Sequence, residues 1–288
     1  MKRTMALKYS VFISIVVLIM LQSGCEEPTF ETNYHSVIVV DGWIENGEFA
    51  RVLLTRTTPF FTIVDSSSYL DLVETFASIS VTNSRETEFL TLTTDNTLFP
   101  RHVYKTTSMR GEIGETYTLR VKLYDTILTA TTTITAPPVI DSLWFEPLPD
   151  NDTLGSLKLQ FTDDALDKNY YRIQVKTGND SRFNPIMTST IDDADLTKPS
   201  NVWPVLKGGI TRIDDAEELY FKKGENVTVK ICSIEKEVFE FWRNYQIESL
   251  NATNPFASSG NNLKGNIEGE GVGIWSGEGS VYKSIRIE

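Results

Sequence analysis

Apolar and polar residues alternate over short stretches along most of this chain, and this period of two constrains the fold more than any other feature. It is clearest after Gly114, where Tyr117, Leu119, Val121 and Leu123 occupy every second position. Successive side chains of a β-strand point to opposite faces, so the pattern predicts a strand with one buried face. Clusters of Gly, Asn, Pro and Ser separate most such runs and predict turns. The sequence therefore predicts a mainly β protein.

The first half of the chain has the pattern of a β-sandwich. The predicted strands are 37–44, 50–57, 77–82, 89–93, 114–124 and 126–135, the last two forming a hairpin that turns near Asp125. The spacing Gly114-x-x-Tyr117 resembles the tyrosine corner of immunoglobulin-like sandwiches. Many short strands with no helical period between them predict an immunoglobulin-like or transthyretin-like β-sandwich domain over residues 37–136.

Pro137-Pro138 marks the predicted end of that domain. Neither proline can donate a hydrogen bond to a sheet, and each restricts the residue before it. Residues 137–288 are predicted to form a second β-rich domain, with strands at 140–145, 157–162, 170–176, 217–221 and 227–234. The Gly-rich tail at 269–287 predicts a hairpin whose last strand closes the second sheet.

One helix is predicted in the second domain, near residues 235–250. Val238, Phe241, Trp242 and Tyr245 recur there at a spacing of three to four residues, which is the period of a helix with one apolar face. This face favours packing of the helix against the second sheet.

The N-terminus has the layout of a bacterial lipoprotein signal. Three basic residues precede an apolar run at 11–21, and two small residues then precede Cys25. The run has about half of the roughly twenty residues that a membrane-spanning helix needs. The layout predicts a signal peptide over 1–24, followed by a leader at 25–36 whose first residue, Cys25, is acylated.

Gln22 departs from the usual lipoprotein pattern, which has Leu three residues before the cysteine. Two other interpretations therefore stay open: an ordinary cleaved signal that leaves Cys25 free, and an uncleaved N-terminal anchor. No A-x-A-like cleavage site follows the apolar run, and the run is short for an anchor. Lipidation of Cys25 remains the prediction.

The charge of the chain restricts its partners. Without the signal peptide it has 39 acidic and 24 basic residues, a net charge of −15. Binding to nucleic acid depends on Lys and Arg that neutralise phosphates, so no nucleic-acid partner is expected. An acidic surface also does not adsorb to anionic lipid, which leaves the lipid anchor as the predicted membrane contact.

Residues suited to nucleophilic or metal catalysis are scarce. His35 lies in the leader and His102 in a strand-like run, and neither is near the Ser and Asp of a catalytic relay. The same shortage excludes zinc sites built from Cys and His. If Cys25 is lipidated, Cys232 has no disulfide partner, and its place in 227–234 favours a small buried side chain over a reactive thiol. We predict no enzyme, no catalytic residue, no metal and no cofactor.

Acidic clusters leave two further interpretations open. Those at 163–164, 192–195 and 214–218 could supply oxygen ligands for Ca²⁺ or the carboxylate pair of a glycoside hydrolase. In a chain this acidic, such clusters are usually solvated loop surface.

The polar stretch at 177–215 is the predicted ligand-binding segment. It is long and only weakly periodic, and a segment of that kind inside a compact domain is usually functional. The candidate residues are aromatic and acidic side chains that could share one face, namely Phe183, Asp192, Asp193, Asp195 and Trp203.

Several blocks of sequence together carry a family resemblance. They are Val39–Ile44, Gly111–Val121, Pro137–Ser142, Asn254–Ser258, Gly265–Gly269 and Gly271–Gly277. In this order they resemble an uncharacterised lipoprotein family of Bacteroidota, a domain of unknown function often encoded beside TonB-dependent outer-membrane receptors. The resemblance spans nearly all of the chain after Cys25. It implies an outer-membrane location and a receptor partner, and it carries over no catalytic residue. Glu26-Glu27 are compatible with display at the cell surface, to which acidic residues after the cysteine often direct lipoproteins of that phylum.

We expect a non-enzymatic outer-membrane lipoprotein that is an accessory or ligand-capturing partner of a TonB-dependent receptor. The first alternative is an adhesion module that binds a glycan or peptide without a receptor. The second is a carboxylate-dependent hydrolase that uses Asp192 and Asp193.

Overall fold

The computed structural model describes residues 34–58, 68–163, 168–178, 180–196, 200–208, 216–251 and 263–288. The chain divides into two compact units, Met1–His35 and Ser36–Glu288, and every element described below belongs to the second. Strands dominate that unit, so the prediction of a mainly β protein is confirmed.

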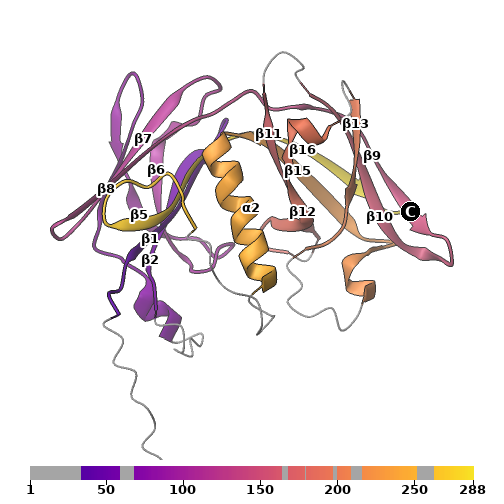
Figure 1. The fold of residues 1–288 in the computed structure, drawn as a ribbon, viewed down its shortest axis with the longest axis horizontal. Helices are drawn as coiled ribbons and strands as arrows, with labels where there is room; N and C mark the ends of the chain where they lie inside the picture. Colours follow the sequence, from indigo (N-terminus) through magenta and orange to yellow (C-terminus); the bar gives the residue numbers. More distant parts are fainter. Residues whose placement is uncertain are drawn as a thin grey trace, which may run out of the picture. The chain divides into compact units, whose positions relative to one another are not determined.

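The largest sheet has eight strands in the order β12-β11-β15-β16-β1-β2-β6-β5 (Figure 1). Its strands are β1 (Ile38–Glu45), β2 (Phe49–Arg56), β5 (Thr91–Thr94), β6 (His102–Arg110), β11 (Tyr170–Thr177), β12 (Asn184–Asp192), β15 (Asn226–Ile234) and β16 (Gly271–Arg286).

Two smaller sheets pack against this large one. The first has the order β4-β3-β7-β8 and contains β3 (Ser78–Thr82), β4 (Thr87–Phe89), β7 (Thr116–Leu123) and β8 (Thr126–Thr133). In the second, β10 (Asn151–Thr162) pairs with β9 (Val139–Leu148), β13 (Ser200–Val205) and β14 (Phe221–Lys222). Each smaller sheet shares one buried apolar cluster with the large sheet.

The first buried cluster contains the tyrosine corner that the sequence predicts. The side chain of Tyr117 is fully buried, and its hydroxyl accepts a hydrogen bond from the Glu112 N–H and donates one to the Arg110 carbonyl. The predicted hairpin is also present as the pair β7 and β8. In the same cluster, Trp275 of β16 donates from Nε1 to the Tyr117 carbonyl at 3.0 Å. A residue close to the C-terminus therefore completes the core of the N-terminal sandwich.

Strand β16 belongs to both halves of the chain. Its first half pairs in parallel with β1, from Ile38 opposite Gly271 to Glu45 opposite Glu278. Its second half pairs antiparallel with β15. In Figure 1 the yellow β16 extends from the side of β1 to the side of β15. The predicted division into domains 37–136 and 137–288 is therefore not confirmed, because one strand joins their sheets.

The hairpin predicted for the Gly-rich tail is wrong, since β16 is one continuous strand of 16 residues. Its glycines allow close approach of other backbone segments and do not make a turn within the strand. A Cβ atom at Gly273 would lie 1.9 Å from the Val40 carbonyl oxygen, and one at Gly279 would lie 1.9 Å from that of Thr135. Side chains at these positions would push β1 and the segment after β8 away from β16.

The predicted helix is confirmed as α2 (Lys236–Asn251). Val238, Phe239 and Phe241 form a third buried cluster with Cys232 and Ile274 of the large sheet. Cys232 is fully buried, its Sγ donates a hydrogen bond to the Arg172 carbonyl at 3.4 Å, and burial raises the pKa of its thiol. These observations agree with a small buried side chain and not with a reactive thiol.

The weakly periodic segment 177–215 contains regular structure, namely β12, β13 and the short helix η2 (Asp193–Asp195). The pairing of β12 with β11 shifts register between Arg172 and Gln174. As a result, Ile186 and Ser189 are both buried although they are three residues apart. A bulge of this kind removes the period of two from the sequence.

Two further short helices are η1 (Ser68–Leu72) and η3 (Ala216–Leu219). In the part of the chain that the structure describes, no helix is long and apolar enough to cross a membrane.

The role of β16 can be tested at Gly273, which has φ of +126°. We expect Gly273→Ala to lower the free energy of unfolding much more than Gly114→Ala does. Gly114 also has positive φ, +84°, but a Cβ there would meet nothing within 4 Å. The left-handed conformation alone costs an alanine about 1–2 kcal/mol, whereas at Gly273 the new methyl group also collides with β1. Urea unfolding measures the two losses, and equal losses would contradict the close pairing of β16 with β1.

Candidate functional site

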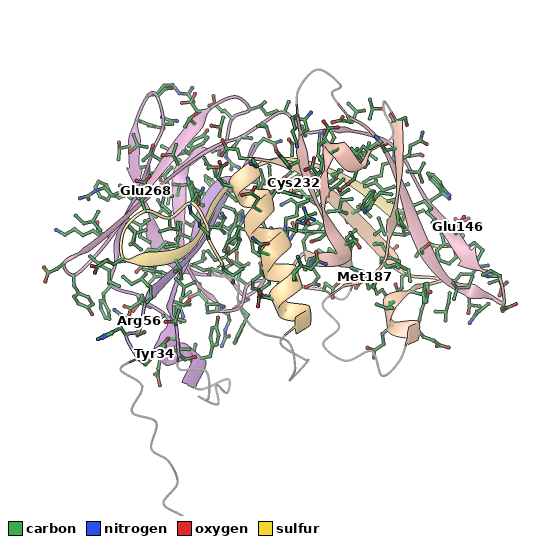
Figure 2. All side chains as sticks on the ribbon, in the orientation of Figure 1. Tyr34, Arg56, Glu146, Met187, Cys232 and Glu268 are labelled. Carbon is green, nitrogen blue, oxygen red and sulfur yellow. The ribbon has the colours of Figure 1, made fainter. Side chains whose placement is uncertain are left out.

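A cavity of about 1390 Å³ lies on the face of the large sheet that does not pack against the smaller sheets. It is larger than the roughly 300–1,000 Å³ typical of pockets for small ligands. Strands β1, β2, β11, β12, β15 and β16 and helix α2 all contribute residues to its walls. Figure 1 shows α2 crossing the sheet, and Figure 2 shows Met187 and Cys232, from β12 and β15, beside this helix.

The alternation along β1 explains why polar groups line this cavity. Val40 and Ile44 are buried in the first sandwich cluster, while Asp41, Trp43 and Glu45 point to the opposite face and line the cavity. The same alternation places Arg172 of β11 and Lys230 of β15 on the cavity face. Each of these strands therefore presents apolar side chains to the sandwich core and polar side chains to the cavity.

Buried charges form the floor of the cavity. Nζ of Lys230 lies 2.7 Å from Oε1 of Glu45 and 2.5 Å from Oε2 of Glu278. Nη1 of Arg172 lies 3.6 Å from the other oxygen of Glu278, and the Tyr282 hydroxyl donates a hydrogen bond to Glu45. All four charged residues are less than 9% exposed. Two cations and two carboxylates therefore meet where β1, β11, β15 and β16 lie side by side.

The charges around them keep Lys230 and Glu278 ionised. Burial alone would lower the pKa of Lys230, but the carboxylates of Glu278 and Glu45 outweigh it and raise that pKa above its usual value. Burial would likewise raise the pKa of Glu278, but Lys230 and Arg172 lower it. The contribution of Glu278 to stability is thus complete above its unfolded pKa of about 4.3 and is lost as the pH falls below that value.

Aromatic side chains form a second part of the cavity wall. The guanidinium carbon of Arg172 lies 3.6 Å from the ring centroid of Trp242, which is a stacking distance. Tyr245 follows Trp242 on the same side of α2 and also lines the cavity. The ring of Phe183 packs against that of Tyr282, with centroids 5.6 Å apart. The helix stripe predicted from sequence is therefore shared between the core and this wall.

The structure brings only one of the five predicted ligand-binding residues to the cavity, and that residue is Phe183. Asp192 accepts a hydrogen bond from the Ala194 N–H at the start of η2. Asp193 is buried and Asp195 is exposed in the same short helix. Trp203 packs against the second sandwich cluster and donates from Nε1 to the Thr188 carbonyl. The acidic run and Trp203 thus have structural roles outside the cavity.

No group of three or more His, Cys, Asp or Glu side chains suited to a metal ion occurs among the described residues. Part of the acidic clusters at 163–164 and 214–218, as well as Cys25, lies outside the described residues.

The charged floor was not predicted from the sequence, although one signal was available. Lys230 interrupts the apolar strand 227–234, and a charge inside such a run has to be paired when it is buried. Its partners could not be identified in the same way. Glu45 and Glu278 come from distant parts of the chain, and only the pairing of β16 with both β1 and β15 brings them together.

This is a mainly β protein with a large cavity over a shared central strand. The chain belongs to the family described as Domain of unknown function (DUF4249), which matches residues 26–280. The matched range includes β1, β11, β15 and most of β16, so the charged floor lies within the family's domain. The curated proteins contain no match to the chain.

We expect Lys230→Met to lower the free energy of unfolding by about 3–5 kcal/mol, because Glu45 and Glu278 would stay buried without their shared cation. Lys283→Met is the matched control, since Lys283 lies on β16 outside the cavity and makes no ion pair in the described part of the chain. It should change the free energy by less than about 1 kcal/mol. Urea unfolding of both variants gives the comparison, and a loss for Lys230→Met no greater than that for Lys283→Met would disprove the role of the network.

Proposed function

We propose that this chain is a non-enzymatic, lipid-anchored protein of the outer membrane that captures a ligand in its cavity and acts with a TonB-dependent receptor. The cavity is the observation that carries this proposal. It is large, its walls are partly aromatic, and its floor holds a few fixed polar groups, which is the usual composition of a ligand site.

The state of the buried acids supports binding more than catalysis. Glu45 and Glu278 are both held by Lys230, and the pKa of Glu278 is lowered. A general acid or base works best with a pKa near the working pH, and Glu278 is moved away from it. Asp192 and Asp193, the residues of the hydrolase alternative, do not line the cavity. The geometry therefore favours capture of a ligand over its cleavage.

The anchor and the receptor partner rest on the sequence. Cys25 follows a signal-like segment, and acylation there would hold the following domain at a membrane. The receptor partner rests on the family resemblance, and the match to DUF4249 over 26–280 supports that resemblance.

Purification of the tagged full chain from detergent-solubilised outer membranes of the bacterium that encodes it tests this proposal. We expect a TonB-dependent receptor to copurify with the chain, and we expect Cys25→Ser to remove the chain from the membrane fraction. Absence of any receptor, or a membrane fraction unchanged by Cys25→Ser, would contradict the accessory role.

Native mass spectrometry of the same preparation tests ligand capture. We expect bound small molecules that are lost in Ser181→Trp, because Ser181 lines the cavity and is exposed, so a bulky ring can enter without disturbing the core. Ser84→Trp is the control, because Ser84 is exposed and does not line the cavity. Identical spectra for the wild type and Ser181→Trp would contradict capture in this cavity.

A further inference from the structure

The guanidinium of Arg172 is buried with at least one donor, Nε, that has no hydrogen-bond partner among the described residues. The residue is 7% exposed and lines the cavity. Its two contacts are the ion pair with Glu278 at 3.6 Å and the stacking on Trp242. Buried polar groups are nearly always hydrogen-bonded, and a guanidinium has five donors. Arg172 therefore has donors to spare for an acceptor in the cavity.

Two further basic residues of the cavity wall are not held by a carboxylate in the described part of the chain. Two others on this wall are paired, Arg51 with Glu48 and Lys207 with Glu225. Arg182 and Lys176 line the cavity without an ion pair or a side-chain hydrogen bond to the described residues. Asp95 and Asp41 line the same cavity without an ion pair to the described residues, and the Asp95 carboxylate accepts hydrogen bonds there only from Thr97. The wall therefore has no net excess of positive charge, but Arg182 and Lys176 are cations that no carboxylate in the described residues holds.

Asp41 is the acid on the cavity wall that makes no ion pair or side-chain hydrogen bond within the described ranges. Burial raises the pKa of its carboxyl, and Arg172 and Arg182 lower it in part. Asp41 and both arginines line the same cavity. Because burial favours the neutral form of this acid, it opposes an anion in the cavity less than an exposed carboxylate would.

From these observations we propose that the cavity takes a small organic acid, with its carboxylate bound by Arg172 and Arg182 and its apolar or aromatic body against Trp242, Tyr245 and Phe183. Planar carboxylates match the fork of N–H donors on a guanidinium, and the charge strengthens each hydrogen bond. The aromatic side chains cover apolar surface of the ligand next to that contact. This inference rests on the proposed capture of a ligand in the cavity and specifies its chemical class.

Three naphthalene probes of similar shape test the inference: 2-naphthoate, 2-naphthamide and 2-naphthylmethylammonium. The three affinities are measured by equilibrium dialysis with the chain that lacks its signal peptide and carries Cys25→Ser. This chain has no acyl group and therefore needs no detergent. We expect 2-naphthoate to bind at least tenfold more tightly than the amide, which matches about 1.4 kcal/mol for a charge-assisted contact. We expect the ammonium probe to bind more weakly than the amide.

Arg182→Gln and Arg243→Gln form a matched pair of variants for this test. Both arginines are exposed, so neither change should prevent folding, but Arg182 lines the cavity while Arg243 lies on α2 outside its wall. Arg182→Gln should lower the affinity for 2-naphthoate about tenfold and leave that for the amide unchanged, whereas Arg243→Gln should change neither. Arg172→Gln, where it folds, should abolish the preference for the carboxylate.

The outcomes separate this inference from the proposal on which it rests. Equal binding of the three probes, removed in each case by Ser181→Trp, would overturn the preference for an acid and leave ligand capture standing. Tighter binding of the ammonium probe would overturn the inference in the same way. No binding of 2-naphthoate, together with a small molecule seen by native mass spectrometry, would also overturn only the acid preference. An empty cavity in both experiments would overturn both proposals.

Discussion

Lys230 joins two carboxylates that come from opposite ends of the chain, and the rest of the structure depends on this contact. Glu45 lies in β1 and Glu278 lies in β16, and both oxygen atoms are within 2.7 Å of the same ammonium group. Removing these charges from water is costly, so they are stable together only in this geometry. The contact requires β16 to lie between β1 and β15, which is the arrangement that unites the two halves of the chain.

The contact also fixes the register of β16. A shift by one residue would turn Glu278 toward Thr133 and Thr135, where Gly277 and Gly279 now allow the backbones to approach, and would turn Trp275 out of the first sandwich core. Fixing this register determines which side chains face the cavity. The polar floor and the apolar cores are thus two faces of the same strands.

Much of the fold could be predicted because its signals are local. The hairpin of β7 and β8, the tyrosine corner at Tyr117 and helix α2 each depend on residues close together in the sequence. The place of β16 could not be predicted, since its pairing with β1 joins residues more than 200 positions apart. Its small residues also hide the alternation that marks other strands.

The candidate site was harder to predict than the fold for the same reason. Phe183 was identified because it lies in a polar segment with few apolar residues. Arg172 and Lys230 were missed because they lie inside strands that the sequence marks as core. The role of a buried charge depends on partners that only the tertiary structure brings together. Asp192 shows the opposite case: its acidic run is conspicuous in the sequence, but in the structure Asp192 begins a short helix.

The central claim is that one shared strand makes residues 36–288 a single cooperative unit. Differential scanning calorimetry of the processed chain tests it most directly. One unfolding transition is expected, with equal calorimetric and van't Hoff enthalpies, because loss of β16 removes Trp275 from one core and takes Glu278 away from Lys230 in the other half. Two separate transitions, one for each half of the chain, would contradict it.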